Sequence, residues 1–325
     1  FETYINYDAT FDKVHKVGIM AGYSWEERVN NDGFGLTVHN FFDDKLKWNQ
    51  LSYAGTIDGM KGVESGTKET IRNISFYGRL SYSYDSRYML QATIRRDDSS
   101  VFGDGHQWGY FPSISGAWNI TEEKFMEGLK ESLSLSNLKL RIGYGVSGNA
   151  LGFGAYSAVA TYGANGTIIS IGGKDYPTLV STKLANPDLK WEKTGMLNIG
   201  LDYAFFNGRL NGSIEYYNKV TKDLIWNYPV TSFLYPFSTI SANVGEITNR
   251  GIEISINAIP VQNKNFTWTT TLNLSHNKNK VNKLTNEKFS TASFTQGDPM
   301  VAGVSAEGYT QQIMEGQPLG TFFTY

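Results

Sequence analysis

The histidines and carboxylates of this 325-residue chain are the side chains that could do acid–base or metal chemistry. The chain has no cysteine, which excludes thiolate catalysis, disulfide bonds and zinc–thiolate sites. Glu122 and Glu123 are adjacent, and adjacent side chains on a helix point apart, so they make a poor acid–base pair. No catalytic constellation emerges from spacing, and we predict that the chain is not an enzyme. No two of the four histidines have the sequence spacing of metal ligands; they are His15, His39, His106 and His276.

Residues 143–148 fit the pattern G-x-G-x-x-G, which binds dinucleotide phosphates when it joins a strand to a helix. The preceding residues alternate like a strand, but residues 149–154 are typical of a loop. Without a helix N-terminus the phosphates would lack their donors. We therefore interpret these glycines as the entry to a loop, and we expect no cofactor.

An acidic segment that contains glycine spans residues 97–104, with carboxylates at Asp97, Asp98 and Asp104. Calcium requires several oxygen ligands around a tight turn, and this composition is compatible with such a site. A solvated turn without metal is the alternative that we favour.

Aromatic side chains are frequent between the predicted strands, beside amides and carboxylates. Planar rings in such surroundings suit the recognition of sugars or peptides. A girdle of rings at a membrane interface is the competing interpretation, and we favour it for rings near strand ends. The candidate substrate contacts in the loops are Tyr156, Tyr162, Tyr176, Trp226, Tyr228 and Tyr235.

The elements that would position these residues are strands, because apolar and polar residues alternate along much of the chain. In residues 76–84 and 88–95, for example, one face is apolar and ringed with tyrosine, and the other is polar. If the apolar face meets lipid, the other face lines a lumen or contacts a plug. Strand parity then predicts these lumen-facing charges: Arg79, Arg95, Lys139, Arg141, Asp202, Arg209, Glu215 and Glu253.

Short and long connections alternate along the chain, as they do in outer-membrane barrels. Asn207-Gly208 predicts a tight hairpin, and residues 121–129 predict a helix in one of the short connections, with Thr121 at its start. We count ten or eleven strands, each near the roughly 9–11 residues of a tilted span. The long connections are expected at residues 25–72, 96–110, 147–190, 227–248 and 277–300. The predicted fold class is all-β: a partial transmembrane antiparallel barrel with long extracellular loops and short periplasmic turns.

Composition is compatible with this prediction. The formal net charge is -2, which gives no electrostatic case for nucleic acid. No apolar run approaches the roughly 20 residues of a transmembrane helix, whereas membrane strands hide apolar residues at alternate positions. Both ends of the sequence look cut, so we expect a fragment.

Several segments resemble the SusC/RagA-like family of TonB-dependent transporters. Residues 96–103 are similar to the family's R-D-G-S-S-x-F-G loop, with Asp98 in place of glycine, so we expect a different turn there. Residues 108–118 are similar to W-G-x-F-P-S-x-S-x-x-W, and residues 186–194 to N-P-x-L-K-W-E-x-T. Further matches, in family order, lie at residues 123–126, 138–149, 198–202, 221–225, 243–245, 249–253 and 315–320.

The resemblance implies that residues 1–325 are part of one 22-stranded TonB-dependent receptor barrel, without its plug domain. It implies active import of oligosaccharides or peptides across the outer membrane of a Gram-negative, Bacteroidetes-like bacterium. It also implies a SusD-like surface lipoprotein as partner, outer-membrane lipid around the wall, and energy from a TonB–ExbB–ExbD complex reached through the missing N-terminal region.

Two other classes of protein remain open at this stage. A passive porin or adhesin-like barrel would share the alternating strands but would lack a plug. A soluble secreted carbohydrate-binding β-protein would also alternate, with its apolar faces packed sheet on sheet.

Overall fold

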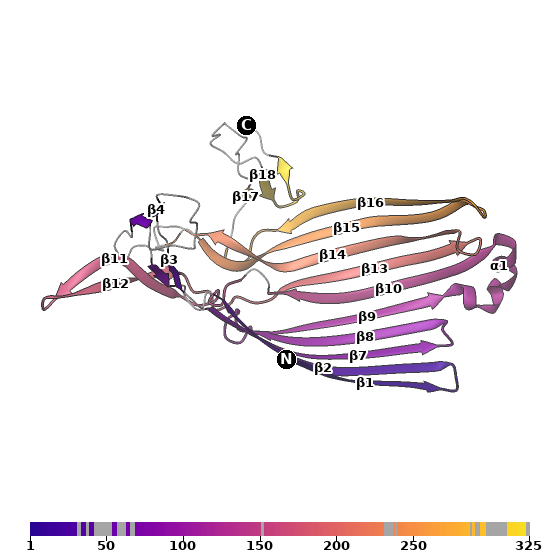
Figure 1. The fold of residues 1–325 in the computed structure, drawn as a ribbon, viewed down its shortest axis with the longest axis horizontal. Coiled ribbons are helices and arrows are strands. Elements are labelled where there is room, and N and C mark those ends of the chain that lie inside the picture. Colours follow the sequence, from indigo (N-terminus) through magenta and orange to yellow (C-terminus); the bar gives the residue numbers. More distant parts are fainter. Residues whose placement is uncertain are drawn as a thin grey trace.

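The computed structural model describes residues 1–30, 34–36, 39–41, 54–56, 63–65, 69–150, 153–230, 237, 239–286, 288–289, 293–296 and 311–322. Within these residues, ten long strands form one antiparallel sheet in which neighbours follow one another along the chain (Figure 1). The strands in order are β1 Glu2–Phe11, β2 His15–Asn30, β7 Glu69–Tyr84, β8 Tyr88–Ser99, β9 Trp108–Asn119, β10 Leu135–Asn149, β13 Glu192–Phe205, β14 Leu210–Pro229, β15 Thr239–Gln262 and β16 Thr267–Lys283.

Short connections meet at one end of this sheet, which we call the turn end. Three of them carry two successive residues with positive φ: Asp12-Lys13, Asp85-Ser86 and Phe206-Asn207. This left-handed backbone matches the twist of the flanking strands and makes a tight hairpin. The predicted hairpin at Asn207-Gly208 is therefore confirmed.

The predicted helix lies at the turn end between β9 and β10, but it begins later than expected. Two 3₁₀ helices, η2 Ile120–Glu122 and η3 Lys124–Met126, precede α1 Glu127–Leu133. Thr121 does not cap α1, because its hydroxyl donates a hydrogen bond to Asn119 Oδ1 (2.7 Å). The α-helix ends at Ser134, whose φ of 49° is left-handed.

The opposite end of the sheet, which we call the loop end, carries the long connections (Figure 1). Small sheets lie within them: β3 Phe34–Leu36 with β6 Val63–Ser65, β4 His39–Phe41 with β5 Ala54–Thr56, and β11 Thr161–Ile171 with β12 Lys174–Lys183. A further sheet combines β17 Ser293–Gln296, β18 Gln311–Met314 and β19 Thr321–Phe322.

Several strands run well past the length expected from sequence. β14 has 20 residues and β15 has 24, and they remain paired from Leu210 opposite Ala258 to Pro229 opposite Thr239. The expected loops at 227–248 and 277–300 are therefore partly wrong, because strand pairing continues into both. A tilted membrane span needs only about 9–11 residues, so both strands are longer than such a span requires.

The long sheet is curved, and its two faces differ. The convex face carries exposed apolar side chains such as Leu80, Ile94, Ile142 and Leu274. Near the loop end, Arg96 on this face lies over the ring of Trp108, with its guanidinium carbon 3.9 Å from the ring centroid. Aromatic rings beside a cation at the border of an apolar band are typical of a membrane interface.

Among the described residues, no helix has the length and apolar character needed to cross a membrane.

Candidate functional site

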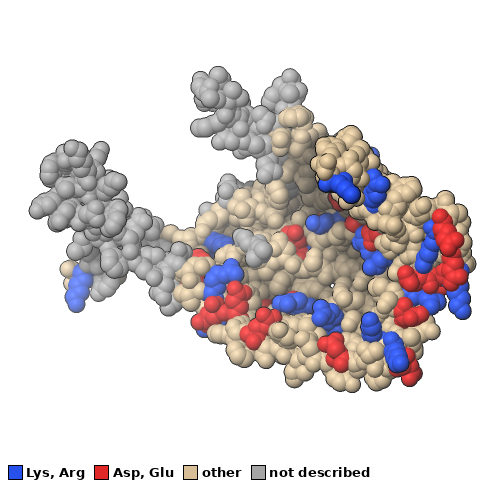
Figure 2. Space-filling model, turned by 45° about the vertical axis from the view of Figure 1, so that its right-hand side comes forward, with Lys and Arg blue, Asp and Glu red and all other residues tan. Residues whose placement is uncertain are grey.

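The concave face of the sheet forms a hollow of about 750 Å³ that extends across β1, β2, β7 to β10 and β13. Figure 2 shows this hollow with basic and acidic side chains along it. Asp8, Lys16, Gln91, Ser115 and Arg141 are among the residues that line it. The face that alternation predicts to be polar is thus the inner face of the curve.

Three charged side chains from neighbouring strands meet on this face, and we call them the charge cluster. Arg141 on β10 donates to both carboxylate oxygens of Asp202 on β13, at 2.8 Å from Nε and 2.7 Å from Nη2. Its Nη2 also donates to Glu215 Oε1 on β14, at 2.7 Å. The paired geometry with Asp202 is the strong form of a guanidinium–carboxylate contact.

Glycine on the intervening strand allows Arg141 to reach Glu215. Gly200 of β13 lies opposite Arg141 on one side and opposite Glu215 on the other. A Cβ atom at Gly200 would lie 2.9 Å from Arg141 Nη2, so the guanidinium occupies the space above this glycine. Glu215 also lies directly opposite Glu253, and Arg141 offsets the repulsion between these like charges.

Strand register places most of the predicted lumen-facing charges on the same face as Arg141. Lys139 lies opposite Asp202, Arg79 lies opposite Met20 and Thr93, and Glu253 lies opposite Glu215. Whether this face lines a lumen stays a prediction.

Arg95 and Arg209 are held by local contacts. Arg95 Nε lies 2.7 Å and 2.9 Å from the two carboxylate oxygens of Asp97, and its Nη2 donates to Ser75 Oγ (2.8 Å). Arg209 lies in the turn before β14, and its Nη2 donates to the carbonyl oxygens of Ile259 and Pro260 at 3.0 Å and 3.1 Å. Arg209 therefore ties the turn before β14 to the neighbouring strand β15 at the turn end.

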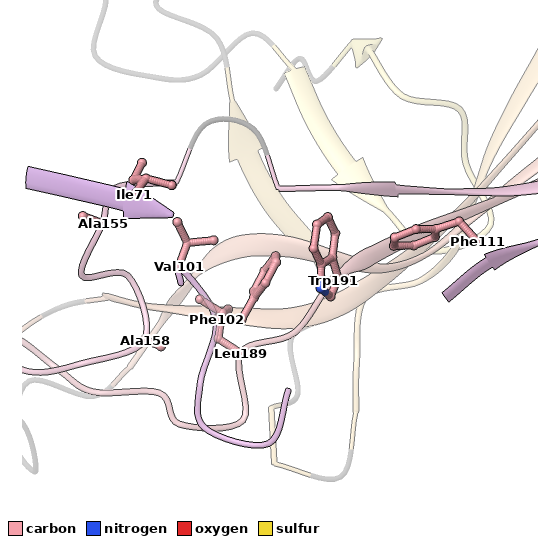
Figure 3. Packing of buried hydrophobic residues seen from close by; sticks show 8 residues of the cluster. All are labelled: Ile71, Val101, Phe102, Phe111, Ala155, Ala158, Leu189 and Trp191. Carbon is pink, nitrogen blue, oxygen red and sulfur yellow. The ribbon is translucent and has the colours of Figure 1, made fainter. Parts of the chain in front are cut away.

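At the loop end, segments far apart in the sequence pack into a buried cluster, which we call the loop-end core. Phe102 and Phe111 pack on Trp191, with ring centroids 4.9 Å and 5.2 Å from it (Figure 3). Trp191 Nε1 donates to the carbonyl of Gln107 (2.7 Å). Among the described residues, the buried members of this cluster are Ile71, Val101, Phe102, Phe111, Ala155, Ala158, Leu189 and Trp191.

Backbone contacts lock the segment 186–191 into this core. Gly103 N donates to Leu189 O (3.1 Å), and a Cβ atom at Gly103 would lie 1.8 Å from Pro187 O. On the other side, Asn243 accepts from the Lys190 amide (2.9 Å) and donates to the Lys190 carbonyl (2.8 Å). The segment thus bridges the loop after β8 and the extended part of β15.

Two expectations about glycine and turns are corrected here. The glycines of residues 143–148 do not open a loop, because β10 continues to Asn149. A Cβ atom at Gly148 would lie 2.1 Å from Phe111 Cζ, so this glycine makes room for the ring. Asp98 does not form a different turn, since it belongs to β8 and pairs with Ile74 and Trp108.

The predicted aromatic contacts have different surroundings. Tyr162 is 69% exposed and Tyr156 is 40% exposed, both at the loop end. Tyr228 is buried against Ala242, Val244 and Phe289, and Trp226 packs against Val281, Leu284 and Ile313. The rings of Tyr228 and Trp226 thus take part in packing, and substrate contact stays a prediction for all of these residues. The side chain of Tyr176 and the whole of Tyr235 lie outside the described residues.

The segment 97–104 is described in full and carries no ready set of oxygen ligands. Both oxygens of Asp97 are bound by Arg95. Within the described part of the chain, no group of three or more His, Asp or Glu side chains is placed to hold a metal ion. A Ca²⁺ site here stays an untested prediction.

Comparisons with known proteins agree with this architecture. Residues 2–312 match the family model "TonB dependent receptor-like, beta-barrel". The whole chain is 36% identical to TonB-dependent receptor P39 of Formosa agariphila, and 96% of it is 33% identical to TonB-dependent receptor SusC of Bacteroides thetaiotaomicron. Each alignment covers 28% of the relative. The solved RagAB peptide transporter superposes on 98% of the chain with a TM-score of 0.80 and 26% identity, over 32% of its own length.

The curved sheet, with apolar residues on its convex face and charges on its concave face, defines a segment of the wall of a large β-barrel. The chain belongs to the TonB-dependent receptor β-barrel family and is similar to SusC and to the RagAB transporter. It spans less than a third of the length of these relatives. The family consists of receptors and transporters rather than enzymes, and the predicted all-β antiparallel fold is confirmed.

Proposed function

We propose that the chain forms part of the barrel wall of an active importer in the outer membrane of a Bacteroidetes-like bacterium. The observation that carries the proposal is the pairing of an exposed apolar convex face with a charged, hollow concave face. Structural similarity to the RagAB peptide transporter over 98% of the chain supports import as the activity.

A sheet that spans lipid must close, because unpaired backbone groups are not tolerated in the hydrocarbon region. In the described part of the chain, β1 and β16 are the outermost strands of the long sheet. Further strands beyond these two edges would complete the barrel, and the concave face would then enclose water. On this arrangement the loop end is extracellular and the turn end is periplasmic.

The concave face would guide a polar cargo. Arg141 is already bound by two carboxylates, so the charge cluster offers an acidic surface rather than a free cation. Serine and asparagine beside Glu215 and Glu253 add hydrogen-bonding groups along a second hollow of about 250 Å³. Such a wall suits hydrated oligomers, and we propose oligosaccharides or peptides as cargo.

Partners follow from the same proposal. A SusD-like surface lipoprotein would close over the loop end, and a TonB–ExbB–ExbD complex would supply energy through a segment outside this chain. The loop-end core would give the lipoprotein a rigid base, because segments 97–107 and 186–191 are fixed to each other and to β15.

Uptake by the intact organism tests the proposal. The full-length gene is deleted, and uptake of labelled peptides and oligosaccharides is compared with that of a complemented strain, with and without a protonophore. Active import predicts loss of uptake on deletion and on collapse of the proton gradient. Uptake that persists with the protonophore would instead indicate a passive porin.

Cell fractionation addresses the remaining alternative. A soluble secreted sugar-binding protein would appear in the aqueous phase after detergent extraction, whereas a barrel wall stays with the outer membrane. Recovery of the full-length protein in the aqueous phase would overturn the membrane proposal itself.

A further inference from the structure

The connection between β9 and β10 presents an unusual apolar surface at the turn end. Phe125, Leu129 and Leu133 are 64%, 46% and 53% exposed. Their spacing of four residues places them along one side of η3 and α1. Met126 of the same segment is buried, so one side of the segment packs against the protein while the three apolar side chains remain uncovered.

Hydrogen bonds hold the start of this segment against the convex face of the wall. Glu123 accepts from Trp118 Nε1 (3.0 Å) and from the Tyr88 hydroxyl. Tyr88 and Trp118 lie opposite each other and share the convex face with Leu90 and Ile114. The connection therefore folds toward the apolar side of the turn end rather than into the hollow.

The end of α1 also joins the convex face. Phe206 N donates to Ser134 O (2.7 Å), and Phe206 is 55% exposed. Its ring lies 6.4 Å from that of Phe205, which in turn lies 6.1 Å from Tyr203 on the convex face. Partly exposed aromatic rings thus lead from the convex face of the wall to the connection that carries the helix.

We propose that Phe125, Leu129, Leu133 and Phe206, which we call the rim patch, insert into the inner leaflet of the outer membrane at the boundary of headgroups and acyl chains. The occupant is phospholipid, because the rim patch continues the apolar band that faces lipid. A short helix with one apolar side that lies in the membrane plane is a known way to anchor a protein. The inference rests on the proposed membrane position of the wall.

Fluorescence quenching by brominated phospholipid tests this inference on the full-length protein in bilayers. Because this chain has no cysteine, Leu129→Cys gives it a single labelling site, with any cysteine elsewhere in the full-length chain replaced by serine. Glu131→Cys, on the polar side of α1, is the matched control. Ile142→Cys, in the middle of the convex face, reports whether the wall itself meets lipid.

The expected result is loss of most of the fluorescence at residues 129 and 142 and its retention at residue 131. Quenching at residue 142 without quenching at residue 129 would overturn the rim patch and leave the membrane wall intact. Absence of quenching at both positions would overturn the membrane position. A blue-shifted but unquenched label at residue 129 would show that protein covers the patch, which also overturns the inference. Leu133→Cys repeats the test if the label at residue 129 prevents assembly.

Discussion

Apolar side chains are exposed in the middle of the wall and buried in the loop-end core. In the wall, Ile94 and Ile142 are 56% and 52% exposed, although they belong to regular, fully paired strands. In the loop-end core, Leu189 and Val101 are 0% and 1% exposed, although much of the surrounding chain is loop. On the proposed membrane position the two regions differ in their surroundings: lipid would cover the apolar groups of the wall, whereas water drives those of the loop end together.

On the proposed function, this difference marks the edge of the membrane. The same sheet thus has two environments: a buried apolar core at the loop end and exposed apolar side chains along the rest of its strands. The boundary falls near Trp108 and Tyr110, whose rings flank Arg96 on the convex face. Substitutions that are equivalent by residue type should therefore have unequal effects in the two regions.

The largest effect is expected from Phe102→Ala in the loop-end core. Loss of a buried phenylalanine leaves a cavity and costs about 3–5 kcal/mol. Hydrogen exchange of the Gly103 amide, which is bonded to Leu189 O, measures the local opening free energy in the full-length protein. Ile142→Ala is the matched control in the wall, where lipid fills the space, and it should cost about 1–2 kcal/mol. Equal losses of stability in Phe102→Ala and Ile142→Ala would contradict the difference between the loop-end core and the wall.

Gly148→Ala should have the next largest effect. The added methyl group would lie 2.1 Å from Phe111 Cζ and 2.9 Å from Trp191 Cε3, and such overpacking costs about 1–3 kcal/mol. Gly143→Ala on the same strand is the control, because its nearest neighbour would be 3.4 Å away. The same exchange measurement applies. The double variant Phe111→Ala with Gly148→Ala should lose less stability than the sum of the two single variants. If the losses are strictly additive, the Phe111 ring is not the cause of the loss at residue 148.

A smaller effect is expected on the concave face from Arg141→Met. Asp202 and Glu215 would lose their shared donor, at a cost of about 1–2 kcal/mol because this face is partly wet. The thermal midpoint of the full-length barrel in detergent measures the change. Adding Glu215→Gln should recover part of the loss, since it removes the repulsion from Glu253. No recovery would mean that repulsion contributes little.

The smallest effect concerns the exposed pair of Asp188 and Lys288 at the loop end. The Lys288 ammonium holds the pKa of Asp188 below its usual value. A lowered pKa in the folded state stabilises the protein at neutral pH, and this contribution disappears as pH falls through the lowered pKa. The thermal midpoint of Asp188→Asn should therefore lie slightly below that of wild type at pH 7 and converge with it in acid. A difference that grows in acid would contradict this assignment.

The sequence by itself determined which side chains lie on each face of the wall. Alternation has a period of two residues, so it assigns each side chain to a face without any knowledge of distant contacts. For the same reason the shared face of Arg141, Asp202 and Glu215 was predictable, and the local sequence Asn207-Gly208 predicted its turn. Membership of a barrel family could also be predicted, because short motifs occur along the chain in the order found in the family.

Only the tertiary structure decided how the loop end is built. The glycines of residues 143–148 resemble a loop by composition, yet Gly148 continues strand β10 opposite Lys193 and leaves space for the ring of Phe111. Tyr228 resembles an exposed ring, yet it is buried by Phe289 across a long separation in sequence. A local sequence pattern cannot predict these contacts, because each depends on which distant segment packs against the residue.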